Sequence, residues 1–195
     1  MAQVSSRDFF ELASDQFDSS KFRELIVYVA QESADDQKFG AVELNKLLYF
    51  SDFEAYAKWG APITGARYQR LRWGPAPRAL LPVRAELVDE EAIRLDTADY
   101  GGYPQERVVA LRVPDLDRFS PAEVRLVDDV IERYRGLDGT EISNVSHEAP
   151  GWQLARDRED IPYFTVLIAP EQPPADVKRE AAELAERHGW LAASR

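Results

Sequence analysis

Cysteine is absent from this chain, and histidine occurs only as His147 and His188. Disulfide bonds, thiolate metal sites and a cysteine nucleophile are therefore excluded at once. The sequence also lacks a basic start followed by an apolar run, which a signal peptide requires, and it has no apolar stretch close to the ~20 residues of a membrane span. We therefore expect a cytoplasmic protein that makes no contact with a membrane.

Positive charge is scarce as well. The chain has 24 Lys and Arg against 35 Asp and Glu, which gives a net charge of −11. Such a protein repels phosphates, which argues against general binding of nucleic acid, and it suits a basic protein partner. Because 45% of the 195 residues are hydrophobic, the chain can bury a core, and its length favours one domain with appended ends.

Hydrophobic periodicity and capping signals predict an α+β fold that is mostly helical. We expect about six helices around a central buried helix, with a small antiparallel hairpin and one or two isolated strands. The predicted helices cover residues 19–33, 41–60, 77–88, 119–136, 138–147 and 174–189, with one further turn at 151–157. The predicted strands are 63–75, closed by Gly74-Pro75, a hairpin with a long loop at 92–114, and 161–168.

Two helix starts carry specific signals. Ser120 and Glu123 predict a capping box with Pro121 at the first helical position, and Asp138 and Glu141 repeat the pattern. At the first predicted helix, Ser19 or Ser20 is the expected N-cap. Pro82 is expected to kink or shorten the helix that contains it.

The stretch "ISNVSHEAPGW" places a serine, a histidine and a carboxylate in a row, at Ser146, His147 and Glu148. A catalytic triad needs these groups to converge in space, whereas neighbours on a helix diverge by about 100°. The sequence has no G-x-S-x-G elbow, no zinc-binding histidine spacing and no phosphate-binding loop. We therefore interpret His147 as part of a helix end on which Trp152 packs, and we expect no metal and no cofactor.

The helix at 41–60 is apolar on nearly all sides. Its leucine face holds Leu44, Leu47, Leu48, Ser51 and Ala55, and a second face holds Tyr49, Phe53 and Tyr56. Such a helix is either central in a core or carries a second face for a partner. Both interpretations of the aromatic face stay open from the sequence alone.

Residues 67–84 contain five arginines and no acidic residue. In "RYQRLRWGP" the arginines alternate with aromatic and aliphatic side chains, a composition typical of protein interfaces. The same arginines could instead pair with acidic residues of the chain itself, or grip a nucleic-acid backbone. The five are Arg67, Arg70, Arg72, Arg78 and Arg84.

The order and spacing of several short elements resemble the Panacea antitoxin domain, also described as the SocA-like antitoxin family. The resemblance covers roughly residues 20–160, and Glu43-Leu44-Asn45 departs from the family's commoner basic-apolar-Gln opening. The matching residues are Leu44, Lys46, Leu47, Leu48 and Tyr49, then Pro62 and Ile63, then Trp73, Gly74 and Pro75, and finally Ile142, Ser143, Ser146, His147 and Trp152.

The resemblance implies a non-enzymatic antitoxin domain at 19–168, between an extension at 1–18 and a C-terminal helix at 169–195. Its partner would be a cognate protein toxin, neutralised by direct binding or delivered to a ClpXP-type protease, often in a prophage setting. We expect the toxin contact at Tyr49, Asp52, Phe53, Tyr56, Arg67, Arg70, Arg72 and Trp73. The alternatives are a DNA-binding regulator that uses the arginines, a phage-associated interaction module and a small hydrolase that uses Ser146 and His147.

Overall fold

The computed structural model describes residues 16–100 and 102–168 and confirms a mostly helical α+β fold. Residues 1–15 of the expected extension, and all of the expected C-terminal helix, lie outside this part. Within it no helix has both the length and the apolar character needed to cross a membrane. Its α-helices are α2 (Ser19–Glu32), α3 (Ala41–Trp59), α4 (Leu80–Asp89), α5 (Pro121–Tyr134), α6 (Gly139–His147) and α7 (Pro150–Leu154).

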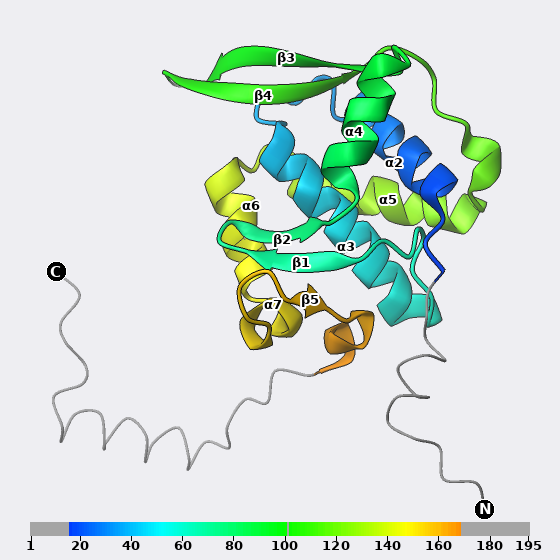
Figure 1. Cartoon of the computed structure of the whole chain (residues 1–195), viewed down its shortest axis with the longest axis vertical. Coiled ribbons are helices and arrows are strands. Elements are labelled where there is room, and N and C mark those ends of the chain that lie inside the picture. Colours follow the sequence, from blue (N-terminus) through cyan, green and yellow to red (C-terminus); the bar gives the residue numbers. More distant parts are fainter. Residues whose placement is uncertain (1–15, 101, 169–195) are drawn as a thin grey trace, which may run out of the picture.

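The α3 helix is the centre of the domain, as predicted. It packs against α2, α5, α6 and strand β2, and Figure 1 shows it crossing the middle of the molecule. At its start the Glu43 carboxylate accepts the Gly40 N–H, and at its end Gly60 adopts φ +75°, a left-handed conformation that favours glycine. The leucine face and, on the aromatic face, Tyr49 and Phe53 are buried, so the core surrounds most of the helix.

The capping boxes predicted at Ser120 and Asp138 are both present, at the starts of α5 and α6. The N-cap of α2, however, is Asp18, whose carboxylate accepts the Lys21 N–H, and not Ser19 or Ser20. Pro82 neither kinks nor shortens α4. It lies in the first turn, where a backbone N–H has no intrahelical partner.

A three-stranded antiparallel sheet is built from β1 (Tyr68–Leu71), β2 (Gly74–Pro77) and β5 (Asp160–Ile161), in the order β2-β1-β5. The sequence predicted only one strand here, closed by Gly74-Pro75, whereas these residues begin β2. Two prolines are tolerated because β2 is an edge strand, where a missing N–H costs no ladder bond. The predicted strand at 161–168 is also wrong beyond Ile161, because Tyr163–Leu167 form the 3₁₀ helix η2.

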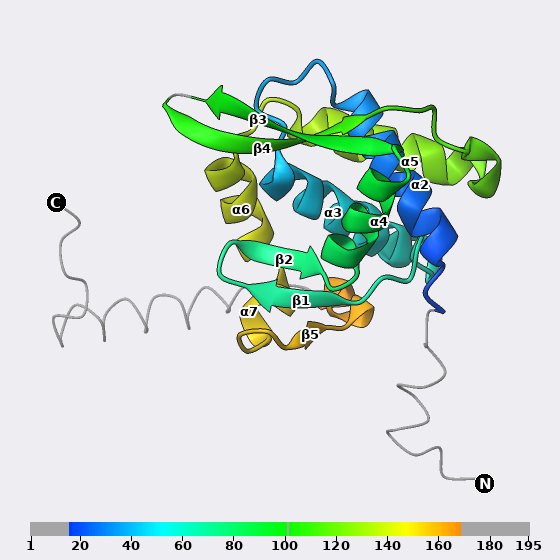
Figure 2. The same ribbon diagram turned by 45° about the horizontal axis from the view of Figure 1, so that its top comes forward.

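The second sheet is the hairpin of β3 (Ile93–Tyr100) and β4 (Tyr103–Ala110). Tyr100 pairs with Tyr103, so the connection is two residues and not the long loop that we expected. A short 3₁₀ helix η1 (Leu116–Arg118) then leads into α5. Figures 1 and 2 agree that β3–β4 and β1–β2 lie at opposite ends of α6.

Candidate partner-binding site at the β1–β2 turn

Two backbone carbonyls at the β1–β2 turn accept hydrogen bonds from side chains of α6 and α7. The Trp152 indole N–H donates to the Leu71 carbonyl at 3.0 Å, and the Ser143 hydroxyl donates to the Trp73 carbonyl at 3.0 Å. These two hydrogen bonds fix the turn between β1 and β2 on the domain.

We call the turn held in this way, residues 71–74, the clamped turn. A stack of two rings and one guanidinium group reinforces its hydrogen bonds. The His147 and Trp152 rings stack with centroids 3.9 Å apart, which confirms that Trp152 packs on the end of α6. On Trp152 lies Arg70, whose Cζ is 4.2 Å from the ring centroid and whose Nε donates to the Trp152 carbonyl. Burial, together with the nearby charges of Lys46 and Arg70, lowers the pKa of His147 below its ordinary value.

Beneath the turn, Gly74 lies directly against the buried side chains of Lys46 and Ser146. Its φ is +101°, and a Cβ at this position would overlap Ser146 Oγ and Lys46 Cε. Lys46 is 2% exposed, and burial lowers its pKa to about 8. Three elements of the family resemblance, represented here by Lys46, Gly74 and Ser146, therefore meet at one point under the turn, although they lie far apart in the sequence.

The top of the turn faces solvent. Trp73 is 59% exposed, and the Arg72 guanidinium lies 4.9 Å from its ring centroid. Solvent-exposed tryptophan beside arginine is the composition of binding hot spots. The clamp thus holds the backbone rigid while it leaves these two side chains free to meet another molecule.

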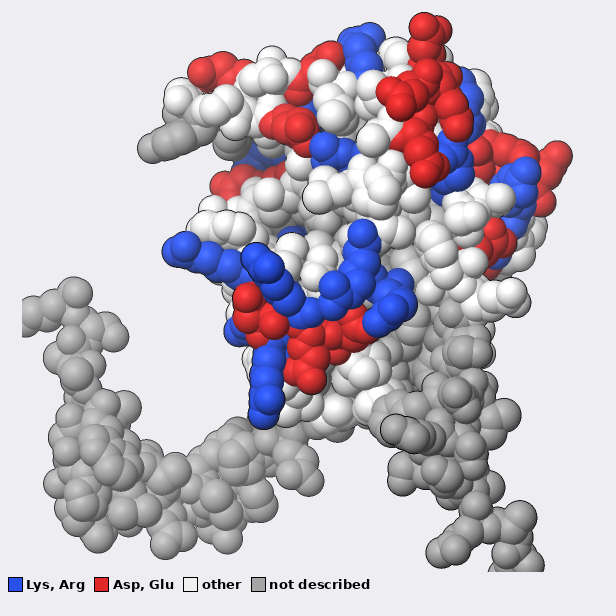
Figure 3. Space-filling view, viewed as in Figure 1, with Lys and Arg blue, Asp and Glu red and all other residues white. Residues whose placement is uncertain are grey.

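The five arginines of residues 67–84, which we call the arginine window, divide between two of the three interpretations that the sequence left open. Arg67 and Arg78 both bind Asp160, and Arg84 pairs with Glu106. Within the described residues, Arg70 and Arg72 form no ion pair with an acid and lie on tryptophan rings instead. Figure 3 shows the basic side chains over β1 and β2, with acidic ones directly below them.

Three of the predicted contact residues lie in the interior. Tyr49, Asp52 and Phe53 are at most 3% exposed, and the Asp52 carboxylate accepts hydrogen bonds from Thr64 and from the Tyr68 hydroxyl. Tyr56 is half-buried and stacks on Tyr163. A buried side chain has no surface to offer a partner, so the aromatic face of α3 belongs to the core in this conformation.

The residues of the hydrolase alternative are occupied by structural contacts. Ser146 is fully buried and its hydroxyl donates to the Ser143 carbonyl at 2.7 Å, while the His147 ring is stacked on Trp152. A nucleophile has to donate to its base and reach a substrate, and this serine does neither here. Among the described residues no group of three or more His, Asp or Glu side chains could hold a metal ion.

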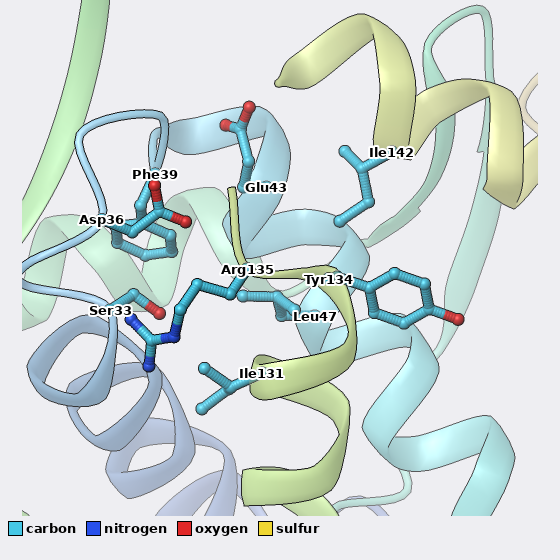
Figure 4. A pocket seen from close by; sticks show the side chains of 9 residues that line it. All are labelled: Ser33, Asp36, Phe39, Glu43, Leu47, Ile131, Tyr134, Arg135 and Ile142. Atoms are coloured by element: carbon cyan, nitrogen blue, oxygen red, sulfur yellow. The ribbon is translucent and has the colours of Figure 1, made fainter. Parts of the chain in front are cut away.

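The described part of the structure contains a small internal cavity and a much larger groove. The cavity, about 10 Å³, lies among side chains of α3, α5 and α6 such as Glu43, Arg135 and Ile142, which Figure 4 shows from close by. That volume suffices for about one water molecule. The groove, about 580 Å³, lies beside Trp73, and its wall comes from four separate segments of the chain. No sequence signal predicted it.

Comparison with known proteins identifies one matching family. The family described as antitoxin SocA-like, Panacea domain, matches residues 44–153. That range begins in α3 at Leu44 and ends one residue after Trp152, so it contains the turn and both elements that hold it. No curated protein and no solved structure matches the chain.

Proposed function

The chain belongs to the SocA-like antitoxin family, which is defined by the Panacea domain, and from this membership we propose that it neutralises a cognate protein toxin by binding it directly. Its role in this proposal is adhesion and not catalysis. The toxin would be encoded beside it, and the acidic character of the chain, net −11, suits a toxin that is basic.

The observation that carries the proposal is the clamped β1–β2 turn. The Trp152 and Ser143 side chains bind the Leu71 and Trp73 carbonyls, and the resulting rigidity lowers the conformational entropy that a partner would have to remove. We assign the toxin contact to Arg72 and Trp73, with Arg70 as support behind them. Tyr56 and Arg67 lie at the margin, since each already has a partner within the chain.

The test is co-expression with the toxic reading frame that neighbours the gene. We expect the wild type to restore growth and to bind the purified toxin. Trp73→Ala should weaken that binding by about 30-fold, which is the loss at a typical hot spot of ~2 kcal/mol. Wild-type protein that neither binds the toxin nor protects the cells would disprove the proposal.

A matched control separates contact from folding. Trp59→Ala removes another exposed tryptophan, 42% exposed at the end of α3, and should leave toxin binding unchanged. The adaptor mechanism is tested in a host without its ClpXP-type protease. Direct binding predicts that protection persists there, whereas delivery to the protease predicts that it is lost.

A further inference from the structure

The groove beside Trp73 lies between the two hairpins. β4 forms one wall, and the turn and α6 form the other, with the start of α3 at its floor. Its residues come from segments separated by up to about 100 positions along the chain. They are Ala41, Val42, Glu43, Trp73, Pro104, Gln105, Glu106, Asp138, Gly139, Thr140 and Ser143.

The lining combines apolar surface with negative charge only. Val42, Trp73 and Pro104 supply apolar contact, and three carboxylates line the groove without any lysine or arginine among the lining residues. Glu43 is buried in the first turn of α3, whereas Glu106 and Asp138 are accessible to solvent. Glu106 already pairs with Arg84 through Oε1, and Asp138 caps α6 through Oδ1, so a basic group that enters the groove would be held by the remaining oxygen of each carboxylate.

The surroundings of the groove have the opposite charge. Arg72 stands beside Trp73 on the turn, outside the lining, so a partner that covers both regions meets a positive rim and a negative floor. Such alternation favours one orientation of the partner over the others, because a reversed partner would place like charges together. The exposed Trp73 belongs to both regions and joins them into one surface.

We infer that the groove holds a segment of the toxin that contributes one apolar side chain against Val42, Trp73 and Pro104 and one lysine or arginine to Glu106 and Asp138. This inference rests on the proposed function, since it names the chemistry of the segment by which the toxin is held. The apolar side chain displaces water from the lining, and the basic side chain fixes the register of the segment.

Two kinds of variant test it with the toxin encoded beside the gene as the probe. Thr140→Arg places a long cation at the exposed edge of the groove and should weaken toxin binding by at least about tenfold, through exclusion and like-charge repulsion. Ala85→Arg on the exposed face of α4 is the matched control and should bind as the wild type does. The melting temperatures of both variants report whether they fold.

The charges are tested separately. Asp138→Asn removes one negative charge and keeps a good N-cap on α6, whereas Glu106 is left in place because its loss would leave the buried Arg84 without its acidic partner. We expect weaker binding at low salt, with the difference from wild type shrinking as salt screens the charges. Asp129→Asn makes the same change in net charge at an exposed position outside the groove and should have no such effect.

A photoreactive phenylalanine analogue at position 140 identifies the occupant. We expect a crosslink to the toxin, at a segment with adjacent apolar and basic residues. A crosslink to a second copy of this chain, or to its own residues 169–195, would overturn the inference. So would undiminished toxin binding by Thr140→Arg, and in that case the proposed function would stand. Absence of toxin binding by the wild type would instead remove the proposed function, and the inference with it.

Discussion

Two regions of the molecule are rich in aromatic side chains and carry parts of the family pattern, yet they are used in opposite ways. On α3, Tyr49 and Phe53 are buried and pack on Tyr68, with ring centroids about 5.5 Å apart in each case. On the β1–β2 turn, Trp73 is mostly exposed. Trp152 of α7 holds this turn in place through a hydrogen bond to the Leu71 carbonyl. Aromatic composition alone therefore does not distinguish core from interface.

The difference follows from where the backbone N–H and C=O groups of each region find their hydrogen-bond partners. A helix satisfies its own N–H and C=O groups, so its side chains are free to fill a core on every side. At the β1–β2 turn, the Leu71 and Trp73 carbonyls accept hydrogen bonds from Trp152 and Ser143, so the backbone of the turn is held against the domain. The side chains that point away from this docking surface, Arg72 and Trp73, remain outside.

The largest expected effect is the loss of unfolding free energy when an aromatic ring of α3 is removed from the core. Phe53→Ala removes a ring that packs on Tyr49 and Tyr163 and should cost about 3–5 kcal/mol of unfolding free energy. Trp73→Ala, an equally drastic truncation on the turn, should cost less than about 0.5 kcal/mol. Chemical denaturation of both variants measures the contrast, and similar losses would mean that the two regions are not energetically distinct.

The sequence predicted this part of the molecule unevenly. The helices that begin at Ser120 and Asp138 were predictable because their caps are local signals. Strand β2 was missed because Gly74-Pro75 normally ends a strand, and only the edge position and the contact with Lys46 explain these residues. The burial of Tyr49 and Phe53 and the groove were not predictable, since both depend on how distant segments pack.

The next largest effect is expected at Gly74, where the β1–β2 turn packs against α3 and α6. Gly74→Ala would strain a backbone at φ +101° and force a methyl group against Ser146 and Lys46, both of which are buried. Strain and overpacking together should cost about 2–4 kcal/mol. Gly102→Ala is the control, because Gly102 also has positive φ but has nothing near its Cβ position. A smaller loss at Gly74 than at Gly102 would refute close packing under the turn.

Lys46 links α3 to the turn at a cost in stability. Its pKa falls to about 8 in the folded protein because burial disfavours the charge, while the unfolded value stays near 10.5. Below pH 8 the lysine is charged in both states, and the folded state bears the full penalty. Between about pH 8 and 10.5 the unfolded state binds more protons, so this residue makes stability rise with pH.

Lys46→Met should therefore stabilise the protein at pH 7 by about 3 kcal/mol, because the pKa falls from 10.5 to about 8 and each pKa unit is worth ~1.36 kcal/mol. Its advantage over the wild type should shrink as pH rises toward 10.5. Taking the difference between the two proteins cancels the contribution of every group that titrates equally in both. A stability difference that stays constant from pH 7 to 10 would show that Lys46 does not titrate as described.

The smallest expected effects concern toxin binding by Arg67 and Arg72, two arginines of residues 67–84 that have different partners. Arg67 is bound to Asp160, and Arg72 lies on Trp73 without an acidic partner in the described part of the chain. Both side chains are exposed, so Arg67→Gln and Arg72→Gln should each change the unfolding free energy by less than about 0.5 kcal/mol. Their effects on toxin binding should nevertheless differ.

For Arg72→Gln we expect toxin affinity to fall about fivefold, mostly through faster dissociation, since the guanidinium that stands beside Trp73 is lost from the contact. For Arg67→Gln we expect no change, since its guanidinium already serves Asp160. Equal losses for the two variants, measured by surface plasmon resonance at physiological salt, would mean that the toxin responds to the positive charge of the whole window. The contact would then be a diffuse electrostatic surface, and the clamped turn would have no privileged place in it.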